Sequence, residues 1–185
     1  KLGWDASAIT GELEGPKAEG KVETSPATQG QIKSHQFIKT PDGSIDFGEI
    51  TLDMAQSMRR QPGKIRLERG DEIYGEHHIE IRHGNDIRAL GYGNVMEFVS
   101  DIAKHIDQVW QPGHTAQLVA LHQVKNDRVM YIELKPAHDE SGDYYTVRSA
   151  FPARAGFVKN KRWNLLWEGR AQPSTNSGKS APFAE

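Results

Sequence analysis

The sequence predicts an α+β domain in which N-terminal helices pack on a small antiparallel β-sheet. Helical signals come first along the chain, over residues 51–60, over 76–83 and from 94 to Pro112. Strand signals follow at 117–124, 128–135 and 143–151, separated by short polar segments. Helices followed by strands are typical of α+β folds, since alternating helices and strands would instead indicate a parallel α/β sheet.

The first and third helical segments have recognisable starts. Thr51 can cap a short helix that continues to about residue 60 and is ended by Pro62-Gly63. Asn94, with Glu97 three residues later, resembles a capping box at the start of the strongest helical segment. Large apolar residues then fall on one helical stripe as far as Pro112: Val95, Phe98, Val99, Ile102, Ile106 and Val109.

The strand segments are connected by turn-forming sequences. "QLVALHQV" and "RVMYIELK" flank the turn "KND", which is the pattern of a β-hairpin. "DYYTVRSAF" follows the polar loop "PAHDESG" as a third strand, and "KIRL" at 64–67 is a short earlier strand. The segment "WNLLW" at 163–167 is either a further strand or the end of a helix.

Both ends of the chain are poor in large apolar residues. Residues 1–41 are predicted to be a linker or extended segment, 42–168 the folded domain, and 169–185 a disordered tail. The chain begins with Lys1 and lacks the apolar core of a signal peptide, so we expect it to be part of a larger parent protein. No apolar run is long enough for a membrane span.

Composition excludes several classes of site. The chain has no cysteine, which removes disulfides, thiolate catalysis and Cys-ligated zinc. Its formal net charge is -2, so the molecule as a whole has no field that would attract nucleic acid, although a local basic patch remains open.

The stretch "GEHHIEIRHGNDI" at 75–87 holds three of the eight histidines, which are His77, His78 and His83. If 76–83 is a helix that Gly84 ends, His78 and Arg82 are neighbours one turn apart. If it is a strand, His78 and Arg82 share a face with Glu80. The glycine in a stop position favours the helix.

Three interpretations of this stretch compete. A zinc site is disfavoured because His78 and His83, five residues apart, would lie on different sides of a helix, and Arg82 would bring positive charge to the ion. We therefore predict no metal and no cofactor. A solvated polar face is the ordinary alternative. The third interpretation is acid/base chemistry, in which histidine moves a proton near neutral pH and arginine stabilises a phosphate.

The segment from 144 to 167 is basic and aromatic and contains no acidic residue. Cations neutralise phosphates and aromatic faces stack on unpaired bases, so this mixture favours single-stranded RNA. The alternative is that the aromatic rings belong to the core and the cations to its solvated rim. The predicted substrate-binding residues are Tyr145, Arg154, Lys161, Arg162 and Trp163.

Strand alternation over 143–151 divides the candidate residues between two faces. Tyr145, Val147 and Ser149 would share one face, while Arg148 would lie on the other. A hydroxyl and an arginine at the end of this strand can position or stabilise a phosphate.

In order along the chain, "GKIRLERG", "HHIEIRHGNDIRALGY", "YTVRSAFPAR" and "NLLW" resemble a phage-associated nuclease family. This family belongs to the barnase, EndoU, colicin-nuclease and RelE-like superfamily, whose domains end phage head-morphogenesis proteins and polymorphic toxins. The resemblance covers about residues 45–168. Its most specific part is a HIxxRHG segment followed by the strand pattern Y-x-V-x-[ST]-A-x-P.

The resemblance implies a barnase/RelE-like fold and a toxin-like, metal-independent endoribonuclease that acts in the bacterial cytoplasm after delivery by a phage or a secretion system. The motif histidine falls on His78, with Arg82 and His83 completing it, and the hydroxyl position falls on Ser149, where threonine is more usual. His78 or His83 would be the general base or acid, Arg82 and Arg148 would stabilise the phosphate, and Ser149 would orient it. RNA is the expected substrate, and an immunity or inhibitor protein an expected partner.

A rival hypothesis from another class is a non-catalytic binding or structural module of a phage virion that keeps the same fold. The near-neutral charge of the chain favours this rival slightly.

Overall fold

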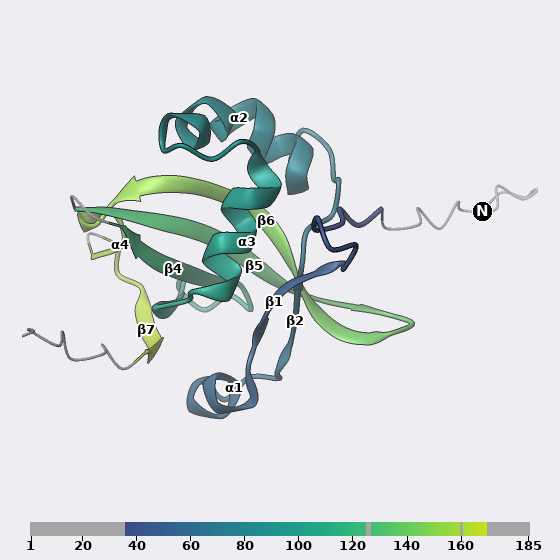
Figure 1. Cartoon of the computed structure of the whole chain (residues 1–185). Helices are drawn as coiled ribbons and strands as arrows, with labels where there is room; N and C mark the ends of the chain where they lie inside the picture. Colours follow the sequence, from purple (N-terminus) through teal and green to yellow (C-terminus); the bar gives the residue numbers. More distant parts are fainter. Residues whose placement is uncertain (1–35, 125–126, 160, 170–185) are drawn as a thin grey trace, which may run out of the picture. The chain divides into compact units, whose positions relative to one another are not determined.

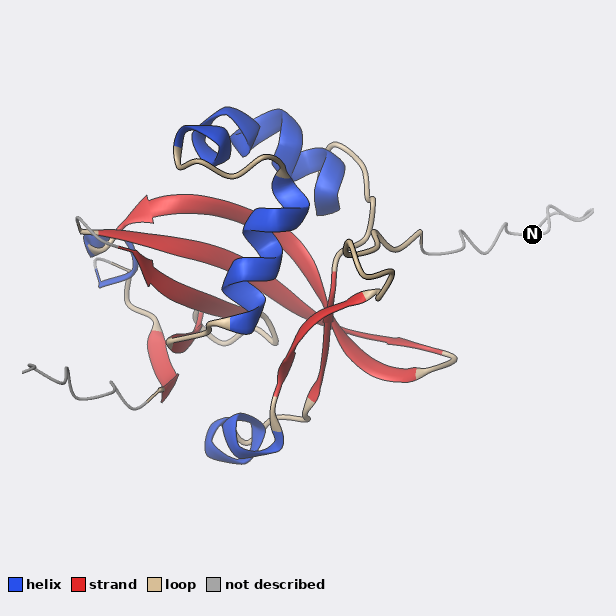
Figure 2. Ribbon diagram, in the orientation of Figure 1, coloured by secondary structure: helices blue, strands red, loops and turns tan. Residues whose placement is uncertain are grey.

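The computed structural model describes residues 36–124, 127–159 and 161–169, which form one seven-stranded sheet and four helices (Figures 1 and 2). The strands are β1 (Asp46–Ile50), β2 (Gly63–Arg66), β3 (Gln108–Gln111), β4 (Leu118–Val124), β5 (Arg128–Asp139), β6 (Gly142–Arg154) and β7 (Asn164–Glu168). The helices are α1 (Leu52–Met58), α2 (Gly75–Ala89), α3 (Val95–Lys104) and α4 (Gly156–Lys159). Of the linker expected at 1–41, residues 1–35 lie outside the described residues, as do residues 170–185 of the tail expected at 169–185.

The α+β class is confirmed, but the sheet is larger than expected and it is mixed. Its strand order is β1-β2-β6-β5-β4-β3-β7, and β2 pairs with β6 in parallel while the other pairs are antiparallel. The helices are interleaved with the strands rather than gathered at the N-terminal side. Pairing of β2 with β6 joins segments far apart in the chain, and no local pattern predicts such a contact.

Helix α1 follows the sequence prediction closely. The Thr51 hydroxyl accepts a hydrogen bond from the backbone N–H of Met54, as an N-cap residue should. The helix ends at Met58 because Arg59 adopts the left-handed conformation, with φ 54°. Pro62-Gly63 then leads into β2.

Helix α3 starts as predicted and ends earlier. The Asn94 side chain accepts from the backbone N–H of Glu97 at 2.9 Å, while the Glu97 carboxylate accepts from the N–H of Gly93. The helix stops at Lys104, so the prediction that it continues to Pro112 is wrong. Val109 belongs instead to β3, which pairs with both β4 and β7, and this pairing outweighs the helical spacing of the apolar residues.

Helix α2 is longer than predicted, because Gly84 lies inside it rather than after its end. Ile79 and Ile87, about two helical turns apart on either side of the glycine, are both fully buried in the core. Glu80 and Arg88 form an ion pair at 2.6 Å, and both of their side chains reach the space beside Gly84. The buried isoleucines hold the helix together across the residue that was expected to end it.

The β5–β6 hairpin is also longer than predicted. Residues 136–139 continue β5 instead of forming a loop, and Asp139 pairs with Gly142 across a tight turn. Near the middle of the hairpin the register shifts, so that Glu133 pairs with Ser149 but Leu134 pairs with Val147. Arg148 is the extra residue of this β-bulge, and a bulge reverses the alternation of side chains beyond it.

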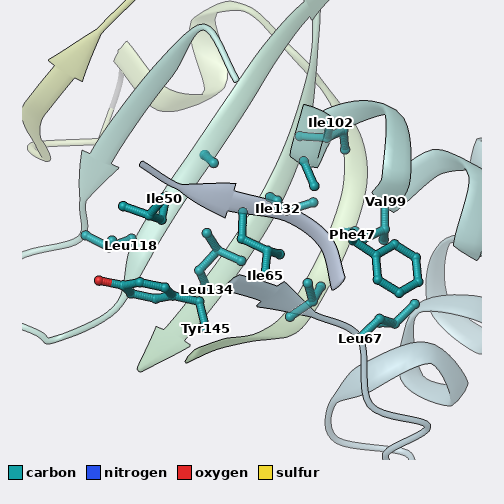
Figure 3. Packing of buried hydrophobic residues seen from close by; sticks show 14 of the residues in the cluster. Phe47, Ile50, Ile65, Leu67, Val99, Ile102, Leu118, Ile132, Leu134 and Tyr145 are labelled. Carbon is teal, nitrogen blue, oxygen red and sulfur yellow. The ribbon is translucent and has the colours of Figure 1, made fainter. Parts of the chain in front are cut away.

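The main hydrophobic core lies between α3 and the sheet (Figure 3). Helix α3 contributes Phe98, Val99 and Ile102, each at 0% exposure. The close approach of α3 to β1 requires a glycine, since a Cβ on Gly48 would lie 2.2 Å from the carbonyl oxygen of Ala103. A second apolar cluster covers the opposite face of the sheet, where Val119 and Tyr131 alternate with core residues of the same strands.

Candidate functional site

Helix α2 packs against β6 (Figure 1). Strand β2 pairs with β6 only as far as Thr146. The helix brings two histidines to this contact. The imidazole rings of His78 and His83 have centroids 6.3 Å apart, and the ring of His83 packs on Phe151 of β6 at 4.8 Å. The two histidines keep the five-residue spacing on a helix that the sequence indicated, yet their rings lie close to each other.

The two histidines differ in their surroundings. The Nδ1 atom of His78 lies 2.7 Å from the carbonyl oxygen of Glu72, and because a carbonyl only accepts, this nitrogen carries the proton. Burial lowers the pKa of His83 from its ordinary value, and the charges of His78 and Arg82 lower it further, against the opposing effect of Asp86. His83 is thus a neutral imidazole at neutral pH.

The other members of the 75–87 motif are less involved. His77 and Arg82 are exposed. Arg82 acts on the histidine pair through its charge, which lowers the pKa of His83. The structure brings together His78, His83 and Phe151 and leaves Arg82 at the surface.

Arg148 of β6 lies beside the start of α2. Its guanidinium group is stacked over the ring of Tyr74, 4.7 Å from the centroid, and the Tyr74 hydroxyl donates to Glu68 at 3.2 Å. Since Tyr74 and His78 are one helical turn apart, Arg148 and the histidine pair lie along the same helix–strand contact. Arg148 meets Tyr74 at the N-terminal end of α2, and Phe151 meets His83 near the middle of the helix.

Arg148 also lines a pocket of about 280 Å³ that the sequence did not indicate. Lys135 of β5 adds a second positive charge to its wall, and Thr146 adds a hydroxyl. The Thr146 hydroxyl is buried and, among the described residues, has no hydrogen-bond partner. The carboxylate of Glu68 also lines the pocket, where it accepts hydrogen bonds from the hydroxyls of Tyr74 and Tyr144. The two cations and the unsatisfied Thr146 hydroxyl are the lining groups suited to an anion, because a buried polar group without a partner is costly.

The bulge decides where Ser149 lies. Ala150 joins the same core cluster as Tyr145 and Val147, so Ser149 does not share their face as strict alternation predicted. It pairs with Glu133 and lies on the face of Phe151 and Tyr131. Glu133 is a further candidate site residue, because it lies opposite Ser149, and the sequence motifs had not indicated it.

Tyr145 does not fit the substrate-binding role expected of it. Its ring is 4% exposed in the main core, and its hydroxyl donates to the backbone carbonyl of Gln61 at 2.7 Å. A ring held in this way cannot stack on a base.

Of the remaining predicted binding residues, Trp163 belongs to an aromatic cluster and Lys161 contacts it. Tyr131 stacks on Phe151 at 4.4 Å, and Phe157 and Trp163 complete the cluster. The ammonium group of Lys161 lies 4.3 Å from the centroid of Phe157 and 4.9 Å from that of Trp163. Arg154 and Arg162 are exposed. The rings pack on the second apolar cluster, as the core alternative predicted, and those of Phe157 and Trp163 remain partly exposed, while binding of RNA stays a prediction.

A second arginine accompanies Arg154. Arg128 of β5 is its direct cross-strand partner, and both are exposed at the end of the hairpin. Like charges placed opposite each other destabilise a sheet unless an anion lies nearby. The two arginines line a pocket of about 360 Å³ with Asp86, and Arg154 also lines one of about 500 Å³ with Phe151 and Phe157.

The metal-ligand grouping in the described residues is not in the 75–87 motif. One potential ligand atom from each of Asp101, His105 and His122 lies within 4.8 Å of the others. None of the helices among residues 36–124, 127–159 and 161–169 is long and apolar enough to cross a membrane.

Comparison of the chain with protein-family models, curated proteins and solved structures found no match.

Proposed function

We propose that the chain is a metal-independent endoribonuclease whose centre is the contact between α2 and β6. The observation that carries this proposal is the pair of imidazoles of His78 and His83, 6.3 Å apart, beside the strand that bears Arg148 and Ser149. Cleavage without a metal needs a proton acceptor, a proton donor and cations for the phosphorane. These three kinds of group lie along one helix–strand contact.

The two histidines divide the proton transfers. His83, kept neutral by burial, is the base that takes the proton of the 2′-hydroxyl. His78 then donates a proton to the leaving 5′-oxygen. The product is a 2′,3′-cyclic phosphate on one fragment and a free 5′-hydroxyl on the other.

The phosphate and the neighbouring nucleotides have separate supports. Arg148, Lys135 and the unsatisfied Thr146 hydroxyl line the pocket that would hold a phosphate. The half-buried rings of Phe157 and Trp163, with Lys161 over both, offer stacking surface and charge for unpaired bases. Arg128 and Arg154 would meet a phosphate further along the strand.

The proposal is tested by incubating the purified chain with total RNA in EDTA, beside His78→Ala, His83→Ala and His114→Ala variants. His114 is exposed between β3 and β4 and serves as the matched control. We expect fragments that end in cyclic phosphate from the wild type and the control, with a loss of about 10²- to 10⁴-fold in the other two.

Full activity of both the His78→Ala and the His83→Ala variant would contradict the assignment of the centre. Cleavage that appears only after a divalent metal is added would contradict the metal-independent mechanism. RNA that stays intact in every buffer would favour the non-catalytic binding module.

A further inference from the structure

A cluster of histidine and aspartate side chains lies where the C-terminal end of α3 meets β4, away from the α2–β6 contact. Asp101 is in the last turn of α3, His105 is its C-cap residue, and His122 is near the end of β4. The three offer ligand atoms within 4.8 Å of one another, and the two imidazole centroids are 5.5 Å apart. Two imidazoles and a carboxylate are a common set of protein ligands for zinc.

The ligands are already oriented by neighbouring groups. The Nδ1 atom of His122 lies 2.9 Å from a carboxylate oxygen of Asp107, so it donates its proton there and leaves Nε2 as the free ligand atom. The hydroxyl of Tyr92 donates to Oδ2 of Asp101 at 2.5 Å, and Oδ1 lies 2.9 Å from Nδ1 of His105, so these two ligand residues are held beside each other. Carboxylate–histidine and hydroxyl–carboxylate contacts of this kind orient metal ligands in proteins.

The electrostatics of the cluster suit a cation. The C-terminal end of a helix is the negative end of its dipole, and the backbone carbonyl of Asp101 also lies 2.9 Å from Nδ1 of His105.

We propose that Asp101, His105 and His122 bind one divalent transition-metal ion, with Zn²⁺ as the ion that this ligand set favours. Zinc–nitrogen bonds of about 2.0–2.1 Å in a tetrahedron separate ligand atoms by roughly 3.4 Å, so the side chains need to close by about 1 Å. The side chain of His105 is 58% exposed and can turn to do so. Water takes the fourth position.

The site has a structural consequence that does not depend on the proposed nuclease activity. A bound ion ties the end of α3 to β4 and encloses the connection that leads into β3. Because the metal binds the folded state, it should raise the thermal midpoint of unfolding.

The test is titration of the full chain, without a histidine tag and freed of EDTA, with Zn²⁺ in a calorimeter and with Co²⁺ in a visible spectrometer. We expect one ion per chain and the absorption bands of tetrahedral cobalt. His105→Ala and His122→Ala should each abolish binding, and Asp107→Ala should weaken it about 10- to 100-fold. His105 is mostly exposed, so its replacement leaves the fold intact, which circular dichroism verifies.

The matched control is His138→Ala, because His138 also lies 2.7 Å from a carboxylate, that of Asp143, but belongs to no cluster of three ligands. Retention of the wild-type affinity in this control completes the expected pattern. The proposal is overturned if the wild type takes up no zinc, if either His105→Ala or His122→Ala binds normally, or if His138→Ala loses the site. A double variant His78→Ala/His83→Ala should still bind, which separates this site from the proposed catalytic pair.

Discussion

Replacement of Gly48 by alanine should destabilise the domain through a clash with the backbone of α3. An added Cβ would lie 2.2 Å from the carbonyl oxygen and 2.7 Å from the carbonyl carbon of Ala103, closer than the 3.0 Å that real Cβ atoms respect. Ordinary contact begins at 3.4 Å, so α3 and β1 have to separate by about 1 Å. Neither obstacle is the flexible end of a side chain.

The magnitude follows from what that separation disturbs. Helix α3 places Phe98, Val99 and Ile102 in the main core at 0% exposure, so moving the helix loosens contacts along its whole buried side (Figure 3). Overpacking usually costs about 1–3 kcal/mol, and an obstacle made of helix backbone places this substitution at about 3 kcal/mol.

Urea denaturation followed by circular dichroism measures the loss, as a lower midpoint at an unchanged slope. Gly84→Ala is the matched control, because the atoms nearest to its added Cβ are the ends of flexible side chains. An unfolding free energy of Gly48→Ala within about 0.5 kcal/mol of the wild type would refute the reasoning about α3 and β1.

Two further predictions concern α2. Gly84→Ala gains about 1 kcal/mol of helix propensity and loses at most the exposed Glu80–Arg88 ion pair, which is worth up to about 1 kcal/mol. The thermal midpoint of this variant should therefore not fall below that of the wild type, and a clear drop would contradict this. Because the pKa of His83 is below 6.5 in the folded state, the unfolded chain binds the proton more readily. The wild type should therefore lose stability, relative to His83→Gln, as the pH falls from 6.5 through the folded pKa; parallel pH profiles would be the contrary result.

Local signals predicted the elements whose residues interact with near neighbours in the chain. The caps at Thr51 and Asn94 and the hairpin of β4 and β5 follow from patterns a few residues long, whereas "WNLLW", which the sequence left open between a strand and a helix end, forms strand β7. Such signals work because the hydrogen bonds and side-chain contacts that they describe form within one element or one turn.

The errors occurred where a distant partner changed the local preference. Gly84 is a good helix terminator alone, but buried Ile79 and Ile87 on either side keep α2 continuous. Val109 continues the helical stripe of α3 in the sequence, yet it belongs to β3 because it pairs with the two neighbouring strands β4 and β7. The bulge at Arg148 places Ser149 on the opposite face of the strand, and no property of the residues 147–149 indicates a bulge.

The same division applies to the candidate sites. Residue types and spacing indicated His78, His83, Arg148 and the basic-aromatic segment as candidates, because titration and charge belong to individual side chains. The packing of His83 on Phe151, the pocket around Thr146 and the cluster of Asp101, His105 and His122 depend on which elements the fold brings together. Chemical character is a property of residues, whereas proximity between distant residues exists only once the hydrophobic core has placed the helices on the sheet.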